Sequence, residues 1–341
     1  MEGANDWVPP VPEGYDDSSR AFLQAMLARG CVNLEDGKEV LAAILTASQG
    51  EDQPAVAAAS VSDDDFGTHI ALIREAVTPL DLDVRSIRDQ ISGERMWAII
   101  NMHSDPSTQL ATIHGPEEIA FIKRLLDSMF EKFNSRRMET MCITAAQARR
   151  VARPARDRDS NANGEGAPAA KGLTKVSQVD EVLASLVDEG WLQRSAAGFY
   201  SLTPRALMEL WGWLHETYND PDAGAGAWQR IKSCEACKEI VTAGQRCADP
   251  DCPVRLHDIC QDAYWRSRRE RECPSCATAW SGTHFVGERA VTETEAYKKA
   301  NPRKGRKSGG GGVGGLVEAL MDQNAAEEDE DEDEDSAMVD D

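Results

Sequence analysis

The chain has 341 residues, of which 41% are hydrophobic, so it is long enough for two or three compact units with apolar cores. Its formal net charge of −22 is unevenly placed, because residues 322–341 hold twelve acidic residues and no basic one. No stretch approaches the roughly 18 apolar residues of a membrane span, and the first residues lack the basic and apolar runs of a secretory signal. We therefore expect neither a membrane protein nor a secreted one.

Residues 18–138 are predicted to form a first winged-helix domain after a disordered N-terminus at residues 1–17. Apolar residues recur at helical spacing near residues 20–29, near 38–47 and from residue 66 onward. A hairpin is predicted from RMWAIINM (95–102), the turn HSDPST and QLATI (109–113). Pro116, followed by Glu117 and Glu118, is typical of a helix N-terminus, and this helix is predicted to close the domain.

Residues 139–225 repeat this order and predict a second winged-helix domain. A short helix near 144–151 precedes a polar stretch with Gly and Pro, which predicts an insertion loop near 153–171. A helix at 176–188, a hairpin at 191–202 and a helix beginning at Pro204 follow. The fold class is therefore α+β and multidomain, with tandem winged helices.

Winged helices often bind DNA, and this use requires a positive face. The predicted helix at 176–188 instead carries Asp180, Glu181 and Asp188 and no Lys or Arg. A basic cluster lies at a helix end and in the insertion loop, where it could contact phosphates without reading sequence. We favour protein docking over direct DNA binding for these domains. The cluster comprises Arg149, Arg150, Arg153, Arg156 and Arg158.

Residues 230–282 contain four pairs of metal ligands. Structural zinc sites use four Cys or His ligands, commonly in pairs a few residues apart, so eight ligands predict two tetrahedral zinc ions. A disulfide cluster is the alternative, but it belongs to oxidising compartments and is disfavoured here. Cys31 and Cys142 stand apart and are interpreted as small buried residues. The pairs are Cys234 with Cys237, Cys247 with Cys252, His257 with Cys260, and Cys273 with Cys276.

Residues 78–130, residues 190–220 and the zinc module together resemble the non-SMC element 1 family of the structural maintenance of chromosomes five–six complex. The resemblance covers about residues 18–280. It implies tandem winged helices, a RING-like domain assigned ubiquitin ligase activity, and DNA repair by homologous recombination in the nucleus. It also implies a MAGE-like non-SMC element 3 partner, other subunits of the complex, and DNA reached through the complex.

A RING cross-brace, in which alternate pairs share a metal, would place Cys234, Cys237, His257 and Cys260 on one zinc and Cys247, Cys252, Cys273 and Cys276 on the other. Protein ligands would then fill all four coordination positions of each zinc. Both ions would be structural, so neither could activate a water. No residue is expected to be catalytic, and any ligase activity would come from positioning a charged ubiquitin-conjugating enzyme.

The RING pattern suggests conjugating-enzyme contacts at Ala236 and Pro274, although a rigid turn beside a ligand is an equal interpretation for Pro274. Ala236 is smaller than the aliphatic residue that RING domains often place there. Ala277 stands where many active RING domains carry a cation. A histone-reading PHD finger shares the ligand order, but the four-residue gap between Cys247 and Cys252 and the presence of Arg271 disfavour it. A non-enzymatic docking subunit remains the second hypothesis.

Residues 283–341 are predicted to form a flexible basic, Gly-rich and acidic tail. KKANPRKGRK (298–307) is either a nuclear localisation signal or a solvated linker, and SGGGGVGG (308–315) is a linker. Residues 316–323 could form a short amphipathic helix with Leu316, Ala319 and Leu320 on one side, too short to be stable alone. The acidic run at 327–335 is expected to be disordered.

Overall fold

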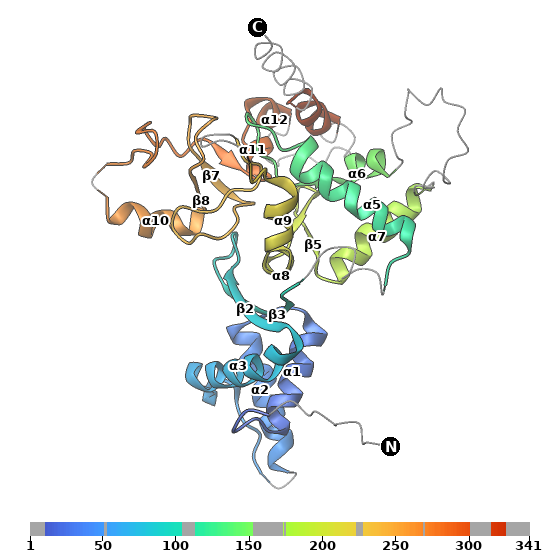
Figure 1. Cartoon of the computed structure of the whole chain (residues 1–341), viewed down its shortest axis with the longest axis vertical. Coiled ribbons are helices and arrows are strands. Elements are labelled where there is room, and N and C mark those ends of the chain that lie inside the picture. The colour runs from blue at the N-terminus through green and yellow to red at the C-terminus, as the bar shows by residue number, and fades with distance from the viewer. Residues whose placement is uncertain are drawn as a thin grey trace. The chain divides into compact units, whose positions relative to one another are not determined.

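The computed structural model describes residues 11–50, 53–103, 113–152, 173, 175–222, 228–268, 270–300 and 315–324. The chain divides into two units, Met1–Ser104 with Pro204–Glu209, and Asp105–Thr203 with Leu210–Asp341. Each unit combines helices with small antiparallel sheets (Figure 1). The predicted insertion loop near 153–171 and the acidic run at 327–335, predicted to be disordered, lie outside the described residues.

The first unit has the helix–strand–helix–helix–strand–strand order of a winged helix. Its three strands pair antiparallel in the order β1-β3-β2. Three of its helices begin at polar caps, since Asp16, Asn33 and Ser62 each accept a hydrogen bond from the first turn. The elements are α1 (Asp17–Arg29), β1 (Val32–Asn33), α2 (Leu34–Gln49), η1 (Ala58–Ser60), α3 (Asp63–Val77), η2 (Thr78–Leu80), β2 (Leu82–Arg88) and β3 (Arg95–Asn101).

Three aromatic rings organise the core of this unit. Phe66 lies edge-on to Phe22 at 5.9 Å and to Trp97 at 5.0 Å between ring centroids. The Phe66 ring lies directly over Gly37 of α2, where a Cβ atom would come within 2.4 Å of the ring. The core therefore depends on a glycine that leaves room for an aromatic side chain. Helix α8 (Pro204–Glu209) also belongs to this unit and adds Met208 to its apolar contacts.

The hairpin of the first unit differs from the prediction. The strand predicted at 95–102 forms as β3, but it pairs with the upstream strand β2, and the chain turns at residues 89–94. Asp89 makes this turn by accepting hydrogen bonds from the amides of Ile91 and Ser92. Strand β2 was not identified from the sequence, because its buried and exposed residues do not alternate along the strand. Most of the predicted downstream strand, at 109–112, lies outside the described residues.

The second unit repeats the winged-helix order. Its strands pair antiparallel in the order β4-β6-β5, which matches the first unit strand for strand. The predicted helix at 176–188 forms with the expected buried face of Val179, Val182, Leu183 and Leu186. The elements are α5 (Pro116–Asp127), η3 (Ser128–Lys132), β4 (Ile143–Thr144), α6 (Ala145–Val151), α7 (Val176–Asp188), β5 (Leu192–Arg194) and β6 (Phe199–Leu202), followed by α9 (Trp211–Tyr218).

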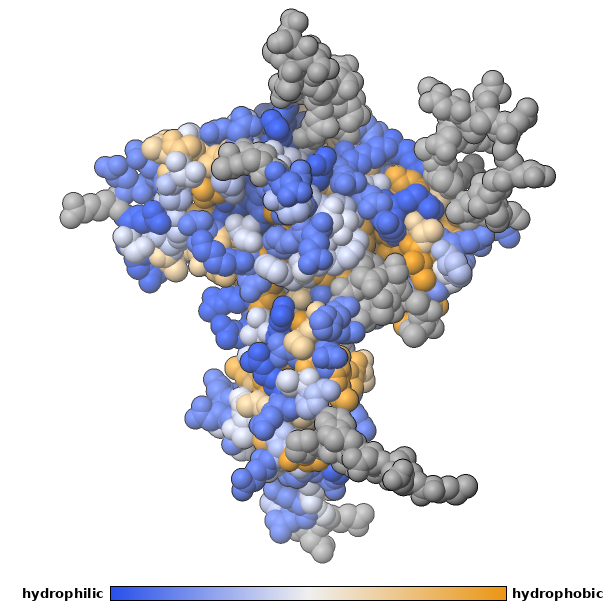
Figure 2. Space-filling model, viewed as in Figure 1, coloured by the Kyte–Doolittle hydropathy of each residue, from blue (hydrophilic) through white to orange (hydrophobic). Residues whose placement is uncertain are grey.

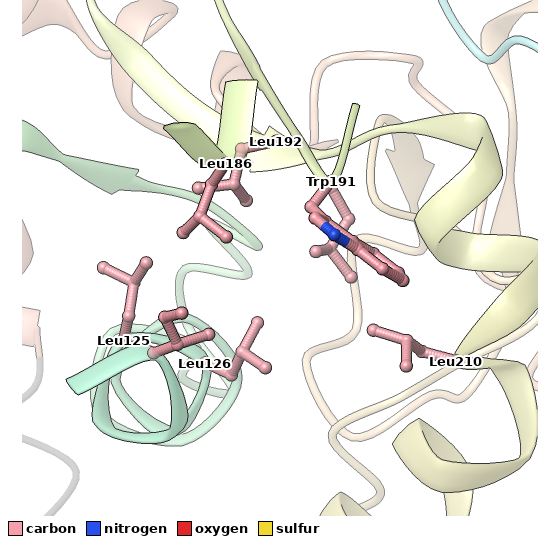
Figure 3. Close-up of a pocket in the computed structure, with 8 residues that line it drawn as sticks. Leu125, Leu126, Leu186, Trp191, Leu192 and Leu210 are labelled. Carbon is pink, nitrogen blue, oxygen red and sulfur yellow. The ribbon is translucent and has the colours of Figure 1, made fainter. Parts of the chain in front are cut away.

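Helix α5 belongs to the second unit, whereas the sequence pattern placed it at the end of the first. Leu125 and Leu126 of α5 face Leu186 of α7 and Trp191, and these side chains line a cavity of about 20 Å³ (Figure 3). The lining is apolar, so a water would find no hydrogen-bond partner there. Helix α5 is thus the first helix of the second winged helix, because its buried stripe completes that core.

The zinc-module segment and the C-terminal helices belong to the second unit. Strands β7 (Gly244–Arg246), β8 (Arg255–Leu256) and β9 (Phe285–Val286) form a third small sheet in the order β8-β7-β9. Helix α10 (Asp258–Arg266) follows β8, and α11 (Arg289–Thr292) and α12 (Glu295–Ala300) follow β9 (Figure 1). The prediction of a flexible tail from residue 283 is therefore wrong for residues 285–300, where Val286 and Val291 are buried. Residues 315–324 form a further helix, which includes the stretch 316–323 where a short helix was predicted.

The visible surface is mostly hydrophilic, with smaller hydrophobic areas between the blue regions (Figure 2). Among the described residues, no helix has both the length and the apolar character needed to cross a bilayer. This surface fits the acidic composition of the chain.

Candidate metal centre

The first predicted ligand quartet comes together in space. One side-chain ligand atom from each of Cys234, Cys237, His257 and Cys260 lies within 4.8 Å of all the others. The Nδ1 atom of His257 is 3.3 Å from Cys237 Sγ and 3.8 Å from Cys260 Sγ. On the far side of the ring, Nε2 lies 3.1 Å from the carbonyl oxygen of Ile240. That carbonyl can only accept, so it holds the proton on Nε2 and leaves the Nδ1 lone pair for a metal.

The second quartet also comes together. Cys247 Sγ lies 3.4 Å from Cys276 Sγ, and Cys252 Sγ lies 3.4 Å from Cys273 Sγ. A disulfide would bring paired sulfurs to about 2.05 Å. Thiolates around a tetrahedral zinc with Zn–S bonds of about 2.3 Å stand about 3.8 Å apart. The spacing therefore fits a shared metal and excludes disulfides in the described residues, and the two clusters are consistent with two structural zinc ions.

Two tight turns hold a cysteine pair in each cluster. The amide of Lys238 donates to the carbonyl oxygen of Cys234 at 2.9 Å, and the amide of Ala277 donates to that of Cys273 at 3.0 Å. Both Lys238 (φ 65°) and Ala277 (φ 58°) are left-handed, a conformation that usually favours glycine. The same backbone device thus closes each Cys-x2-Cys turn, and Ala277, selected from the sequence as an empty cation position, has this second, geometric role.

A buried ionic cluster joins the zinc module to the segment between η3 and β4 of the second winged helix. Glu139 is 0% exposed, and its carboxylate accepts hydrogen bonds from Arg255 Nε at 2.7 Å and Lys232 Nζ at 3.0 Å. Arg255 Nη2 also donates to Glu139, and Arg246 Nη1 lies 3.6 Å away. The main chain contributes as well, since the amide of Gly287 donates to the Glu139 carbonyl oxygen. Neither composition nor periodicity marked any of these residues.

The charge state of Glu139 follows from this environment. Burial alone would raise the pKa of its carboxyl, but the Arg255 hydrogen bonds and the charges of Lys232, Arg255 and Arg246 outweigh burial and lower that pKa to about 2. Burial also lowers the pKa of Lys232 to about 8, against the opposite effect of Glu139. Glu139 is therefore ionised at neutral pH, and the cluster buries three cations around one carboxylate.

The net positive charge of the cluster around Glu139 is opposite in sign to the charge that each ligand quartet would carry with zinc bound. A zinc ion with three thiolates and a neutral histidine carries a formal charge of roughly −1, and one with four thiolates roughly −2. The cations lie beside the ligands in the chain: Lys232 is two residues before Cys234, and Arg255 two before His257. Thiolate-bound metal would thus balance a buried charge that Glu139 alone leaves uncompensated.

The aromatic residues of the module mainly pack its interior. Trp265 and Trp280 are buried, with ring centroids 5.6 Å apart, and Trp280 Nε1 donates to Gln245 Oε1 at 3.0 Å. Tyr264 packs edge-on against Trp265 and lies under the Arg268 guanidinium, 4.3 Å from its ring centroid. The two tryptophans therefore pack inside the module and are not displayed on its surface.

The remaining candidate residues differ in their exposure and in their contacts. Ala236 and Pro274 are both exposed, each between two cysteines of its turn. Cys142 is buried, and Cys31 is half-buried; burial raises the pKa of both thiols, to about 11 for Cys31, so neither is an activated nucleophile. Two members of the basic cluster already have partners, since Arg149 pairs with Asp180 and Arg150 with Asp322. The other three arginines of that cluster lie outside the described residues.

Comparison with protein families identifies the family of this chain. The family described as "Nse1 non-SMC component of SMC5-6 complex" matches residues 19–210, more than half of the sequence. The chain belongs to the Nse1 family. A second family, described as a RING-like domain, matches residues 234–276, which span both Nse1 ligand quartets from first to last.

Individual relatives agree with the Nse1 assignment. The chain is 25% identical over 207 residues to non-structural maintenance of chromosomes element 1 of Schizosaccharomyces pombe, covering 61% of this chain and 73% of the relative. It is 22% identical over 246 residues to the Homo sapiens homolog, covering 72% and 75%. Among solved structures, a chain of an "Nse1-Nse3-Nse4 complex" matches with a TM-score of 0.59 at 19% identity, over 78% of this chain and 97% of that chain, and shows the shared fold.

Proposed function

We propose that this Nse1 protein is a RING-type ubiquitin-protein ligase subunit of a nuclear SMC5-6 complex that acts in DNA repair by homologous recombination. It would dock a MAGE-like Nse3 partner and position a ubiquitin-conjugating enzyme charged with ubiquitin. The observation that carries this proposal is the pair of interleaved ligand quartets within a segment that matches a RING-like family. The eight residues of these quartets are the proposed zinc ligands.

The proposed mechanism is positional. When bound, the zinc ions would hold the two turns in place, and all four ligands of each quartet come from protein, so the metal has no open position for a water. No side chain of the module is proposed as a nucleophile, because its cysteines are the metal ligands. The reacting thioester would belong to the conjugating enzyme, and the module would raise the rate by restricting its orientation.

The proposed contact surface consists of the exposed residues Ala236 and Pro274, one at each turn. Pro274 offers a rigid apolar contact without a backbone donor. Ala236 offers little apolar area, and Ala277 offers no cation to clamp ubiquitin. These two alanines predict weak activity for the chain alone, and we propose that binding of the partner subunit increases it.

A structural role without ligase activity is the second candidate, and the buried cluster around Glu139 favours it. The cluster joins the zinc module to the second winged helix through ion pairs that are almost fully buried. A module held in this way can serve as a rigid docking surface for the Nse3 partner even if no conjugating enzyme binds. Both candidates require zinc, so metal content alone cannot separate them.

Direct DNA reading by the third helices is disfavoured by their charge. Helix α7 has three acidic residues and no basic one, and α3 has three aspartates in its first turn. A negative helix would be repelled by the phosphate backbone. DNA is therefore proposed to be reached through the complex.

The deciding experiment is single-turnover discharge of ubiquitin from a panel of charged conjugating enzymes, with the full chain alone and with its Nse3 partner. Pro274→Ala should reduce discharge several-fold, whereas Ser275→Ala, at the neighbouring exposed residue, should not. Ala277→Arg should increase discharge, because it supplies the missing cation at a residue that is exposed and already left-handed. Cys273→Ser should abolish it together with metal binding.

The outcome separates the two candidates. Acceleration that depends on Pro274, in chains that keep two zinc ions and still bind the partner, would support the ligase. If neither the natural chain nor Ala277→Arg accelerates discharge with any enzyme, the ligase proposal fails and the architectural role stands.

A further inference from the structure

The helix at residues 315–324 packs against α6 of the second winged helix. Its residues Val317 and Met321, one helical turn apart, are 5% and 1% exposed, and they form its buried side. This differs from the side predicted from the sequence, because Leu316, Ala319 and Leu320 remain partly or fully exposed. A C-terminal segment therefore covers a face of α6 through a short apolar stripe.

The polar contacts of this helix with α6 involve particular side chains, but each contact is weak. Gln147 Nε2 of α6 donates to the thioether sulfur of Met321 at 3.3 Å, and a thioether is a poor acceptor. Arg150 forms a two-pronged ion pair with Asp322, at 2.5 and 2.9 Å, but both side chains are more than a third exposed. Exposed ion pairs contribute about 1 kcal/mol or less. The docking therefore rests mainly on two apolar side chains.

The length of the segment makes its helical form depend on docking. Helices shorter than about 12–15 residues are marginal in water, and this one spans residues 315–324. Residues 301–314 connect it to α12, and tethers of this length give effective concentrations on the order of 1 mM. A segment with an intrinsic dissociation constant of roughly 0.1 mM would then be about 90% docked within its own chain.

We propose that this face of α6 is a docking site for a short acidic amphipathic helix, and that the chain's own residues 315–324 are its exchangeable occupant in cis. The site recognises two apolar residues four apart, the second a methionine, followed at once by an acidic residue that reaches Arg150. Arg150 is part of the basic cluster near the insertion, so docking of the helix also neutralises one of its cations. This inference is independent of the ligase proposal.

The test uses a fluorescent peptide of residues 313–326 and full-length chains, read by fluorescence anisotropy. Met321→Asp in the chain should displace its own helix and expose the α6 face. The peptide should then bind this variant about tenfold more tightly than the natural chain, because the competing cis segment is gone. Equal weak binding to both chains would overturn the proposal.

A charge exchange tests the recognition itself. Adding Arg150→Asp to the Met321→Asp chain should weaken the natural peptide severalfold, and a peptide with Asp322→Arg should restore binding. Arg88→Asp, an exposed arginine of β2 in the first unit, is the matched control and should change nothing. Loss of binding in the control, or no rescue by the exchanged peptide, would show nonspecific charge attraction and refute the site.

Sedimentation of the natural chain distinguishes the source of the helix. The cis arrangement predicts a monomer at all concentrations, with or without Met321→Asp. A concentration-dependent dimer that Met321→Asp abolishes would assign the helix to a second copy and overturn the cis assignment.

Discussion

The two winged helices share one strand order but are stabilised differently. The first unit closes around an aromatic core in which Phe66 touches Phe22 and Trp97. The second packs leucines of α5 against Leu186 and Trp191, and it is also joined to the zinc module by the buried charges around Glu139. The same topology thus leaves one copy dependent on its own apolar packing and makes the other dependent on an ionic cluster and, by our proposal, on metal.

Removal of zinc should produce the largest difference in stability between the two units. Structural zinc in small domains contributes on the order of 10 kcal/mol to folding, so a strong chelator should unfold the module. The loss should extend to the second winged helix, because the cations around Glu139 would lose both their geometry and their anionic neighbours. Hydrogen exchange read by mass spectrometry should show faster exchange in β7, α10 and α7 and little change in α1 and α3.

Restoring zinc should return the protection of the second unit, which separates metal loss from irreversible damage. Equal loss of protection in α3 would contradict the proposed independence of the two copies.

Glu139→Gln should have the next largest effect. It keeps the shape of the side chain but leaves three buried cations without their carboxylate, and breaking a buried pair in this way costs about 3–5 kcal/mol. The matched change in the first unit is Asp83→Asn. Its partner Arg74 is largely exposed, so we expect about 1 kcal/mol or less. Hydrogen exchange of each unit in increasing urea measures both, and comparable losses would argue against the asymmetry.

The pattern of ligands was predictable from the sequence, whereas the Glu139 cluster was not. Cys and His pairs at short spacings have few chemical uses, so the residues themselves indicate both quartets. Helix α7 was equally clear, because Val179, Val182, Leu183 and Leu186 repeat at helical spacing. Glu139 and Arg255 are 116 residues apart and obey no local pattern. Long-range charge pairing appears only once the fold has brought the chain together.

The boundary between the two winged helices was missed for a related reason. A helix that begins at Pro116 is well marked locally, but nothing local tells whether its stripe faces the preceding core or the following one. Strand β2 was missed because Arg85 and Arg88 interrupt its apolar residues. Elements were therefore predictable where one residue pattern sufficed, and assignments between neighbouring domains were not.

Replacement of glycine by alanine should have opposite effects on stability at two positions of the first unit. Gly37→Ala would place a Cβ atom within 2.4 Å of the Phe66 ring, and overpacking of this kind costs about 1–3 kcal/mol. Gly67→Ala, on α3 next to Phe66, meets nothing within 4 Å and should stabilise by about 1 kcal/mol through helix propensity. Hydrogen exchange of α1 and α3 in increasing urea should show opposite shifts of the unfolding midpoint of the first unit. Shifts of the same sign would mean that the aromatic core does not depend on the space above Gly37.

The smallest expected effect tests the charge on the first copy's α3. Ser62 and Asp65 form a reciprocal cap, and the hydrogen bonds from Ser62 lower the pKa of Asp65. A lowered carboxyl pKa stabilises the fold above the usual aspartate pKa near 4, and this stabilisation is lost as pH falls through the lowered value. Ser62→Ala should slightly lower the stability of the first unit near neutral pH, and it should reduce the loss of that stability as the pH falls below about 4. At the start of α7 the amide of Lys175 donates to the uncharged Gln178 side chain, so the second copy's winged helix should keep its pH dependence in the Ser62→Ala chain. A parallel change in α7 protection would show that the cap acts beyond its own unit.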